Sequence, residues 1–197
     1  MEPPRLPGPG SRLAVPRVRV EPGTGTILTR VTETRQWQLE TAAPEDAPPI
    51  HGLRRQLEDW LYDRGIEQWP RGEVSFDRIA SEVEREEWRR VRLPDLGVVA
   101  AMRVLWSDPD FWGADSTPAI YVHGLMVDRS MARTGMGTFL LESAAEIGRA
   151  AGLGTFRLDC AESNDVLRSY YAARGFHEVD RHVMRGLFPV ILFEKRI

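Results

Sequence analysis

The part of the sequence that most constrains the fold is a strand–helix–strand unit in the second half of the chain. Residues 119–127 form an apolar run of strand length, and residues 135–151 repeat apolar side chains at the spacing of an amphipathic helix. A second short apolar run follows at residues 155–160. Two strands joined through a crossover helix lie parallel in one sheet, and the connection is right-handed. This unit predicts an α/β fold.

The remaining apolar patterns add helices and hairpins around this unit. The turn at 94–97 makes its two flanking strands an antiparallel hairpin. Hairpins and one parallel crossover in the same sheet predict a mixed, mostly antiparallel central sheet flanked by helices in a single domain. The additional predicted helices are 49–63, 75–87 and 164–174, and the additional predicted strands are 27–32, 88–93, 98–105, 176–180 and 190–195.

The start of the chain differs in composition from the rest. Residues 1–25 hold six prolines and four glycines and show no periodicity, which predicts a disordered tail ahead of one folded domain at 26–197. This weakly basic tail either contacts a partner or is dispensable, and its composition favours the second interpretation.

The charge balance argues against several classes of partner. The chain has 26 basic and 29 acidic residues, a net charge of −3 and a pI of about 5.9, so neither nucleic acid nor an anionic membrane is expected as the main partner. It shows no membrane-spanning apolar stretch and no apolar leader core, so we expect a cytoplasmic protein. Cys160 is the one cysteine, which excludes a disulfide within the chain, and the histidine spacing predicts no metal site.

A glycine-rich turn between the apolar strand and the long helix is the first segment that indicates chemistry. Gly135 and Gly137 let an anion approach the first turn of the helix, whose N–H groups have no partners within the helix and carry the positive end of its dipole. Arg133 adds a positive charge beside them. The segment predicts a phosphate or pyrophosphate cradle. The alternative is a tight strand-to-helix turn that requires small residues.

The second such segment is the short helix at 164–174. Asn164 is its predicted N-cap and Gly175 follows its end. Tyr170 and Tyr171 lie within this helix, and a tyrosine whose hydroxyl faces a cleft can donate a proton to a leaving group. The alternative is that both rings pack in the core.

Taken together, the two segments resemble the GNAT superfamily of N-acetyltransferases, and the resemblance covers about residues 26–197. The family combines a strand ending in a Leu-x-Val-like run, a Q/R-x-x-G-x-G/A loop, and a helix with the pattern N-x-x-[A/L]-x-x-x-Y-x-x-x-G-F. The matching residues are Leu125–Val127 at the strand end, Gly135–Gly137 in the loop, Asn164 and Tyr171 seven apart, and Gly175 with Phe176.

The resemblance implies a GNAT-like central sheet and an enzyme that moves an acetyl group from acetyl-CoA to an amine. Backbone groups of Leu125, Met126 and Val127 would hold the pantetheine arm and the thioester oxygen, and Asn164 would contact the pantetheine or support its helix. One departure is Ala132, which stands where the family has Gln or Arg. The residues implied in pyrophosphate binding are Arg133, Thr134, Gly135, Met136, Gly137 and Thr138.

The mechanism that the resemblance implies is direct attack of the amine on the thioester, without a covalent enzyme intermediate. Tyr171 would protonate the departing thiolate, and a strand N–H would stabilise the oxyanion. His123 is the candidate general base, because residues 121–127 are similar to the arylalkylamine N-acetyltransferases, in which a histidine at this place is tied to proton removal. Strand alternation places His123 on the same face as Tyr121 and Leu125. The alternative for His123 is a hydrogen-bonded core histidine.

The acceptor is the part of the reaction that the sequence defines least. Glu67 and Trp69 lie in the segment between the first two helices, which tends to line the acceptor pocket in this family, and with Tyr121 they are the candidate substrate-binding residues. The expected acceptor is a small-molecule or peptide amine, and a homodimer is compatible with the family. Two alternatives stay open, namely a transferase of another acyl group and a CoA-binding sensor or accessory domain without turnover.

Overall fold

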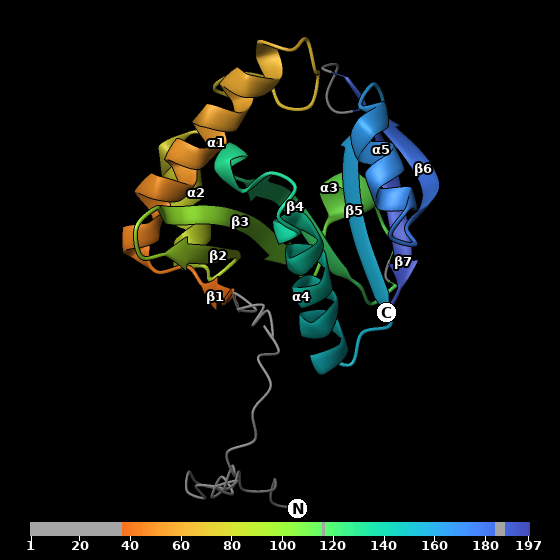
Figure 1. Cartoon of the computed structure of the whole chain (residues 1–197). Helices are drawn as coiled ribbons and strands as arrows, with labels where there is room; N and C mark the ends of the chain where they lie inside the picture. The colour runs from red at the N-terminus through yellow and green to blue at the C-terminus, as the bar shows by residue number, and fades with distance from the viewer. Residues whose placement is uncertain (1–36, 116, 184–187) are drawn as a thin grey trace, which may run out of the picture. The chain divides into compact units, whose positions relative to one another are not determined.

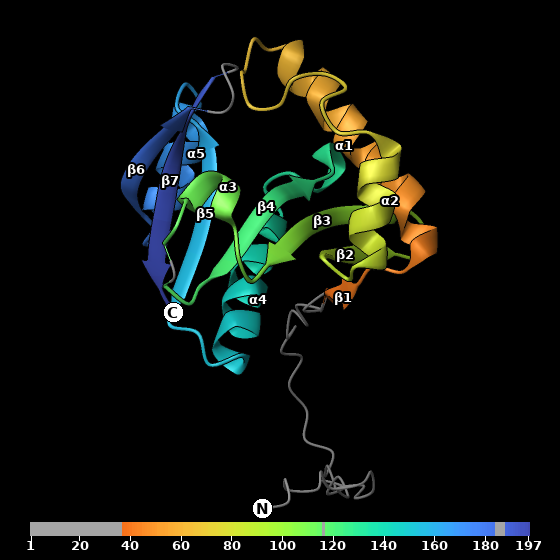
Figure 2. The same ribbon diagram turned by 180° about the vertical axis from the view of Figure 1, so that it is seen from behind.

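A seven-stranded sheet with helices on both faces forms the part of the chain that the computed structural model describes, residues 37–115, 117–183 and 188–197 (Figures 1 and 2). The predicted mixed, mostly antiparallel sheet is confirmed, because β4 and β5 are parallel and the other neighbouring strands are antiparallel. In spatial order the strands are β1 (Glu40–Thr41), β2 (Trp88–Leu93), β3 (Gly97–Leu105), β4 (Ile120–Val127), β5 (Thr155–Ala161), β7 (Pro189–Arg196) and β6 (His177–Val183).

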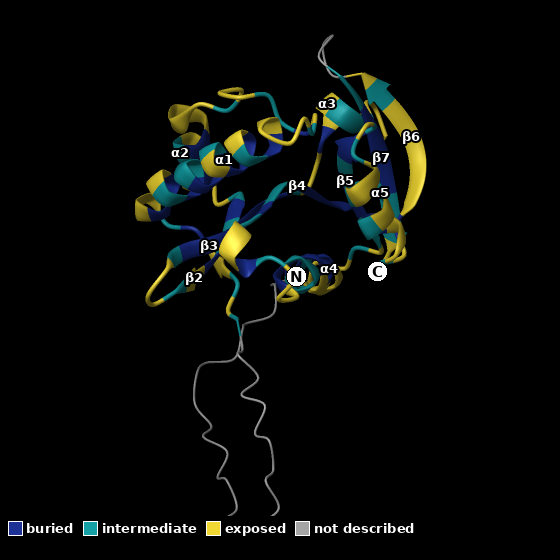
Figure 3. Ribbon diagram, turned by 45° about the horizontal axis from the view of Figure 1, so that its top comes forward, coloured by how far each residue is buried: buried dark blue, intermediate teal, exposed yellow. Residues whose placement is uncertain are grey.

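Helices cover the two faces of the sheet and bury a core on each side. Ile50 and Ile79, from α1 and α2, pack with Trp88 on one face, whereas Leu140 of α4 packs with Phe156 on the other. Figure 3 shows the central strands buried and β6 exposed at the sheet edge. Among the described residues, no helix is long and apolar enough to cross a membrane. The helices are α1 (Ala47–Tyr62), α2 (Phe76–Glu84), α3 (Pro109–Trp112), α4 (Met136–Ala150) and α5 (Asp165–Ala172), with short 3₁₀ turns η1 (Pro44–Asp46) and η2 (Arg129–Met131).

The predicted elements within the described residues are all present, with ends that agree to within three residues. β1 and α3 were not predicted, because elements of two and four residues are too short to show a period. The tail predicted at 1–25 and the strand predicted at 27–32 lie outside the described residues.

The parallel pairing of β4 and β5 covers only the first part of each strand. Three residues of β4 that start at Ile120 pair with three residues of β5 that start at Phe156, and beyond them the two strands separate. β5 stays paired with β7 as far as Ala161, so the sheet opens on the β4 side of β5 alone. Backbone N–H and C=O groups that lose a strand partner need another one, which makes this opening a natural place for a ligand.

A bulge at Gly124 changes which side chains of β4 face the opening. Ala101 pairs with Met126 and Arg103 with His123, so two steps along β3 oppose three steps along β4. Gly124 provides the left-handed backbone at this point, with φ of +54°. Leu125 therefore packs toward α4, while Met126 packs toward α1 and α2. The expectation that His123 and Leu125 share a face is wrong, because the extra residue reverses the alternation.

Replacing Gly124 with alanine is expected to lower the free energy of unfolding by about 2–4 kcal/mol, from left-handed backbone strain and overpacking. The added Cβ would lie 3.0 Å from Cη2 of Trp88, whose buried ring has little room to move. Gly152→Ala is the matched control, because Gly152 also has a positive φ but its Cβ would meet open space. Urea unfolding of both variants measures the difference, and equal losses would contradict a steric role for Trp88.

Candidate active site

A cavity of about 1110 Å³ extends along the opening between β4 and β5. Residues of β4 on either side of the bulge line it, together with Asp159 of β5. On one face of the sheet its wall includes the first turn of α4 and part of α5, and on the other face it includes α1 and the segment that joins α1 to α2. The cavity therefore passes from one face of the sheet to the other.

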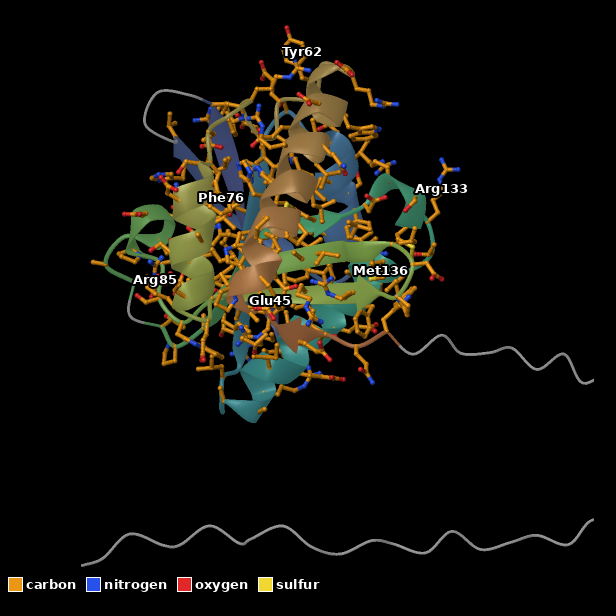
Figure 4. The ribbon with its side chains drawn as sticks, turned by 90° about the vertical axis from the view of Figure 1, so that its left-hand side faces the viewer. Glu45, Tyr62, Phe76, Arg85, Arg133 and Met136 are labelled. Atoms are coloured by element: carbon orange, nitrogen blue, oxygen red, sulfur yellow. The ribbon has the colours of Figure 1, made fainter. Side chains whose placement is uncertain are left out.

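The first turn of α4 presents a row of unpaired backbone donors to this cavity. Gly135 precedes the helix with φ of +94° and provides no side-chain cap. Arg133 is also left-handed, with φ of +63°, and Figure 4 shows its side chain extending outward from the loop. No acceptor among the described residues pairs with the N–H groups of Gly135, Met136, Gly137 or Thr138. Four such donors at the positive end of a helix fit an anion such as a diphosphate.

One side chain of α5 and one from the turn that follows it approach the first turn of α4. The hydroxyl of Tyr170 lies 2.7 Å from the position that a Cβ on Gly137 would occupy, which explains the need for glycine there. Arg174 lies over the Tyr170 ring at 3.4 Å and donates from Nη2 to Oγ1 of Thr138 at 2.8 Å. Arg174 lines the cavity, so it adds a second cation beside Arg133. Arg174 was not among the predicted site residues, although its spacing of four from Tyr170 places the two on one face of the predicted helix.

Tyr171 lies next to Tyr170 on α5, with the two ring centroids 5.8 Å apart. Its ring packs against Phe176 and Phe193 and is 5% exposed, and it lines the cavity wall. Burial raises the pKa of Tyr171 well above its usual range. Its hydroxyl has no hydrogen-bond partner among the described residues and is not sealed from the cavity. The phenol is therefore protonated at neutral pH and free to donate.

His123 lies between two carboxylates that come from different elements. Its Nε2 is 2.9 Å from Oδ2 of Asp108, just before α3, and its Nδ1 is 3.0 Å from Oδ1 of Asp159 on β5. Phe111 packs against the imidazole with ring centroids 5.0 Å apart. Burial lowers the pKa of His123, but the two carboxylates outweigh this effect and raise the pKa from 6.5 to about 9.

This environment favours a role for His123 other than the predicted general base. A general base needs a free lone pair at the working pH, whereas both ring nitrogens of His123 face carboxylates and the imidazole is protonated at neutral pH. The geometry instead fits a charged histidine that holds Asp108 and Asp159 in place at the opening of the sheet. Neither carboxylate was among the predicted site residues, because they lie 15 and 36 residues from His123 along the chain.

The predicted acceptor-binding residues have different positions. Trp69 lines the cavity, and the guanidinium of Arg54 lies over its ring at 4.0 Å. Glu67 is exposed and outside the cavity wall. Tyr121 is also outside the wall, because its hydroxyl accepts a hydrogen bond from Arg157 at 3.1 Å and its ring is 3% exposed. Of the three predicted acceptor-binding residues, Trp69 alone lines this cavity.

The predicted CoA-binding residues mostly line the cavity, with two exceptions. Leu125 and Val127 line it, whereas the side chain of Met126 is buried on the opposite face. Thr134 is exposed and outside the wall, and its hydroxyl donates to the backbone oxygen of Met131 at 2.7 Å. Asn164 lines the cavity and caps α5 by accepting from the Leu167 N–H at 3.1 Å.

The chain is similar to proteins of one known family. The model of the acetyltransferase (GNAT) family matches residues 54–176. The uncharacterized N-acetyltransferase YesJ of Bacillus subtilis (strain 168) is 31% identical over 141 residues, which are 68% of this chain and 78% of YesJ.

Solved structures give the same result. A GNAT-family acetyltransferase from Listeria monocytogenes 4b F2365 has a TM-score of 0.68 and 25% identity, over 82% of this chain and 95% of its own. The PaiA N-acetyltransferase from Thermoplasma acidophilum, solved in complex with coenzyme A, has a TM-score of 0.63 and 19% identity, over 82% of this chain and 99% of its own. At 19% identity, the likeness to the PaiA N-acetyltransferase shows a shared fold.

Proposed function

Because the chain belongs to the GNAT family of N-acetyltransferases, we propose that it transfers the acetyl group of acetyl-CoA to a primary amine by direct attack in a ternary complex. The proposal rests on the chemical groups that line one cavity. Its wall holds the unpaired amides at the start of α4, the free hydroxyl of Tyr171, and the carboxylates of Asp108 and Asp159. These groups match a diphosphate, a departing thiolate and an ammonium.

The residues present fit coenzyme A along the whole opening. The amides of Gly135–Thr138 would hold the pyrophosphate, and Arg133 and Arg174 would add positive charge. Beyond Val122 the backbone of β4 has no β5 partner, so its N–H and C=O groups are available to the amides of the pantetheine arm. Met126 would contribute through its backbone alone, because its side chain faces the other way.

Tyr171 is the proposed general acid. The amine nitrogen attacks the carbonyl carbon of the thioester, the C–S bond breaks, and the sulfur takes up a proton. Tyr171 carries that proton because burial keeps its phenol neutral. The same desolvation raises the pKa of a thiol held beside Tyr171. The pKa values of the phenol that gives the proton and of the thiol that receives it therefore rise together inside the cavity.

In this proposal, the carboxylates of Asp108 and Asp159 bind the ammonium group of the acceptor. Each carboxylate places one oxygen on His123, and its other oxygen has no partner among the described residues. Two carboxylates and one imidazolium sum to one negative charge at the cavity wall, which matches a single ammonium with its several N–H donors. The ammonium loses its proton through these carboxylates and water before the nitrogen attacks.

Acetyl-CoA at about 100 times its Kd is expected to stabilise the folded protein by about 2.7 kcal/mol, or about 5–10 °C in Tm. Thermal unfolding with acetyl-CoA, succinyl-CoA and NAD measures this shift, and NAD, which has a diphosphate but no pantetheine, is the control. A shift with acetyl-CoA followed by thiol release with amines supports the proposal. A larger shift with succinyl-CoA points to another acyl group, and binding without release from any amine points to a sensor. No shift with any CoA ester would refute the proposal.

A further inference from the structure

The segment at residues 63–75, here called the acceptor loop, joins α1 to α2 and forms part of the cavity wall through Ile66, Trp69 and Val74. In Figure 1 it leaves the end of α1 and runs toward α5. The two ends of the loop are held by α1. Near its start the Ile66 N–H donates to the Leu61 oxygen, and near its end the Gly72 N–H donates to the Glu58 carboxylate at 2.9 Å.

The middle of the acceptor loop is tied to the opposite side of the opening by one side chain. Oε1 of Gln68 accepts from the N–H of Ala161 at 3.2 Å and from Nδ2 of Asn164 at 3.1 Å. Gln68 is 8% exposed, so these bonds are largely shielded from water. Within the described part of the chain, no other hydrogen bond joins the acceptor loop to β5 or α5.

The opening of the sheet supplies one of these two donors, and the cap of α5 orients the other. Ala161 is the last residue of β5, and its N–H faces the opening, where β4 has already separated from β5. The oxygen of Gln68 thus supplies the acceptor that a neighbouring strand would otherwise supply. The Asn164 amide is oriented by its own cap, since Oδ1 takes the Leu167 N–H and leaves Nδ2 for Gln68. Gln68 therefore connects the acceptor loop to the start of the helix that carries Tyr171.

We propose that Gln68 is the positioning residue of the acceptor site, because its double hydrogen bond holds Ile66 and Trp69 over the cavity. The inference rests on the proposed function, since the loop forms the acceptor side of that cavity. It assigns to Gln68 an effect on acceptor binding that is separate from acetyl-CoA binding and from the chemical step.

Gln68→Met and Gln68→Glu form the matched pair of variants. Methionine keeps the length of the side chain but loses the strong acceptor, whereas glutamate keeps an acceptor oxygen at the same reach. Gln68→Met is expected to raise the acceptor KM about 10-fold, the factor that corresponds to about 1.4 kcal/mol. We expect kcat and the KM for acetyl-CoA to stay near the wild-type values, and Gln68→Glu to stay near wild type in all three. Asn164→Ser, which retains a capping oxygen, is expected to raise the acceptor KM and to add nothing in the double variant with Gln68→Met.

Tryptic cleavage at Arg64 and Arg71 tests the same inference without any acetyl transfer. Both arginines lie in the acceptor loop and are exposed, so cleavage there is expected to accelerate in Gln68→Met and not in Gln68→Glu. If no amine is acetylated, the proposed function fails while cleavage still decides the role of Gln68. Equal cleavage of the two variants, or an unchanged acceptor KM in Gln68→Met, would overturn the inference.

Discussion

Replacing Tyr171 with phenylalanine is expected to reduce kcat by about 100- to 1000-fold, within the range for loss of a general acid. Phenylalanine retains the packing against Phe176 and Phe193, so the fold and the cavity shape are expected to persist. The Kd for acetyl-CoA is expected to stay near the wild-type value, because the anion cradle at the start of α4 is untouched. Thiol-release kinetics and calorimetric titration with acetyl-CoA measure the two quantities.

Tyr170→Phe is the matched control for this result. It removes a neighbouring hydroxyl that lies beside Gly137 and 3.5 Å from Oγ1 of Thr138. The expected effect is on the KM for acetyl-CoA, with kcat near the wild-type value. An unchanged kcat in Tyr171→Phe, or equal losses of kcat in the two variants, would show that Tyr171 is not the general acid.

His123→Gln is expected to lower the free energy of unfolding by about 3 kcal/mol at about pH 6, with a loss that shrinks as the pH rises to about 10. The folded protein holds the pKa of His123 at about 9, above the ordinary value of 6.5. A raised pKa stabilises the folded state below the ordinary value, and this contribution is lost as the pH rises through the folded value. Urea unfolding of both proteins across this range measures the difference. A difference that does not change with pH would contradict the charged state of His123.

Kinetics separate the two roles considered for His123. An α-amine acceptor, with a pKa of about 7.7–8.0, is already neutral when His123 titrates. If the imidazolium holds Asp108 and Asp159 in place, kcat/KM for such an acceptor falls as the pH rises through about 9. If neutral His123 were the base, kcat/KM would rise over the same range. A fall through about pH 9 that is absent in His123→Gln therefore indicates positioning, whereas a rise indicates proton removal.

Features encoded in short stretches of sequence were predictable. The spacing of apolar residues predicts α4 and the strands beside it, and the glycines at 135 and 137 predict unpaired amides at the helix start. Asn164 and Tyr171 lie on one short helix, so their separation along the chain fixes their separation in space. Gly124 also carried a signal, because an isolated glycine inside a strand pattern indicates a bulge. A bulge at this position places the side chains of His123 and Leu125 on opposite faces of the sheet.

Features that depend on contacts between distant segments were not predictable. Asp108, Asp159 and His123 come from three elements, and nothing local distinguishes these two aspartates from surface residues. Gln68 lies in a loop without a period, and its partners are 93 and 96 residues away. Tyr121 was misplaced for the same reason, since its hydroxyl is taken by Arg157 on the neighbouring strand. A single sequence gives the identity of such groups but not the packing that brings them together.

The early end of the β4–β5 pairing divides the sheet mechanically into two plates. β1 to β4 form one plate and β5 to β7 the other, and the connections between β4 and β5 include three residue pairs, the contact from His123 to Asp159 and the hydrogen bond from Arg157 to Tyr121. Bending at this seam is expected to meet less resistance than bending between β3 and β4 or between β5 and β7, because those neighbours share longer ladders. A linear molecule lying in the seam and bonded to both sides would act as a stiffener. Cosubstrate loading would then slow amide hydrogen exchange in both plates at once, including at positions that the molecule never contacts.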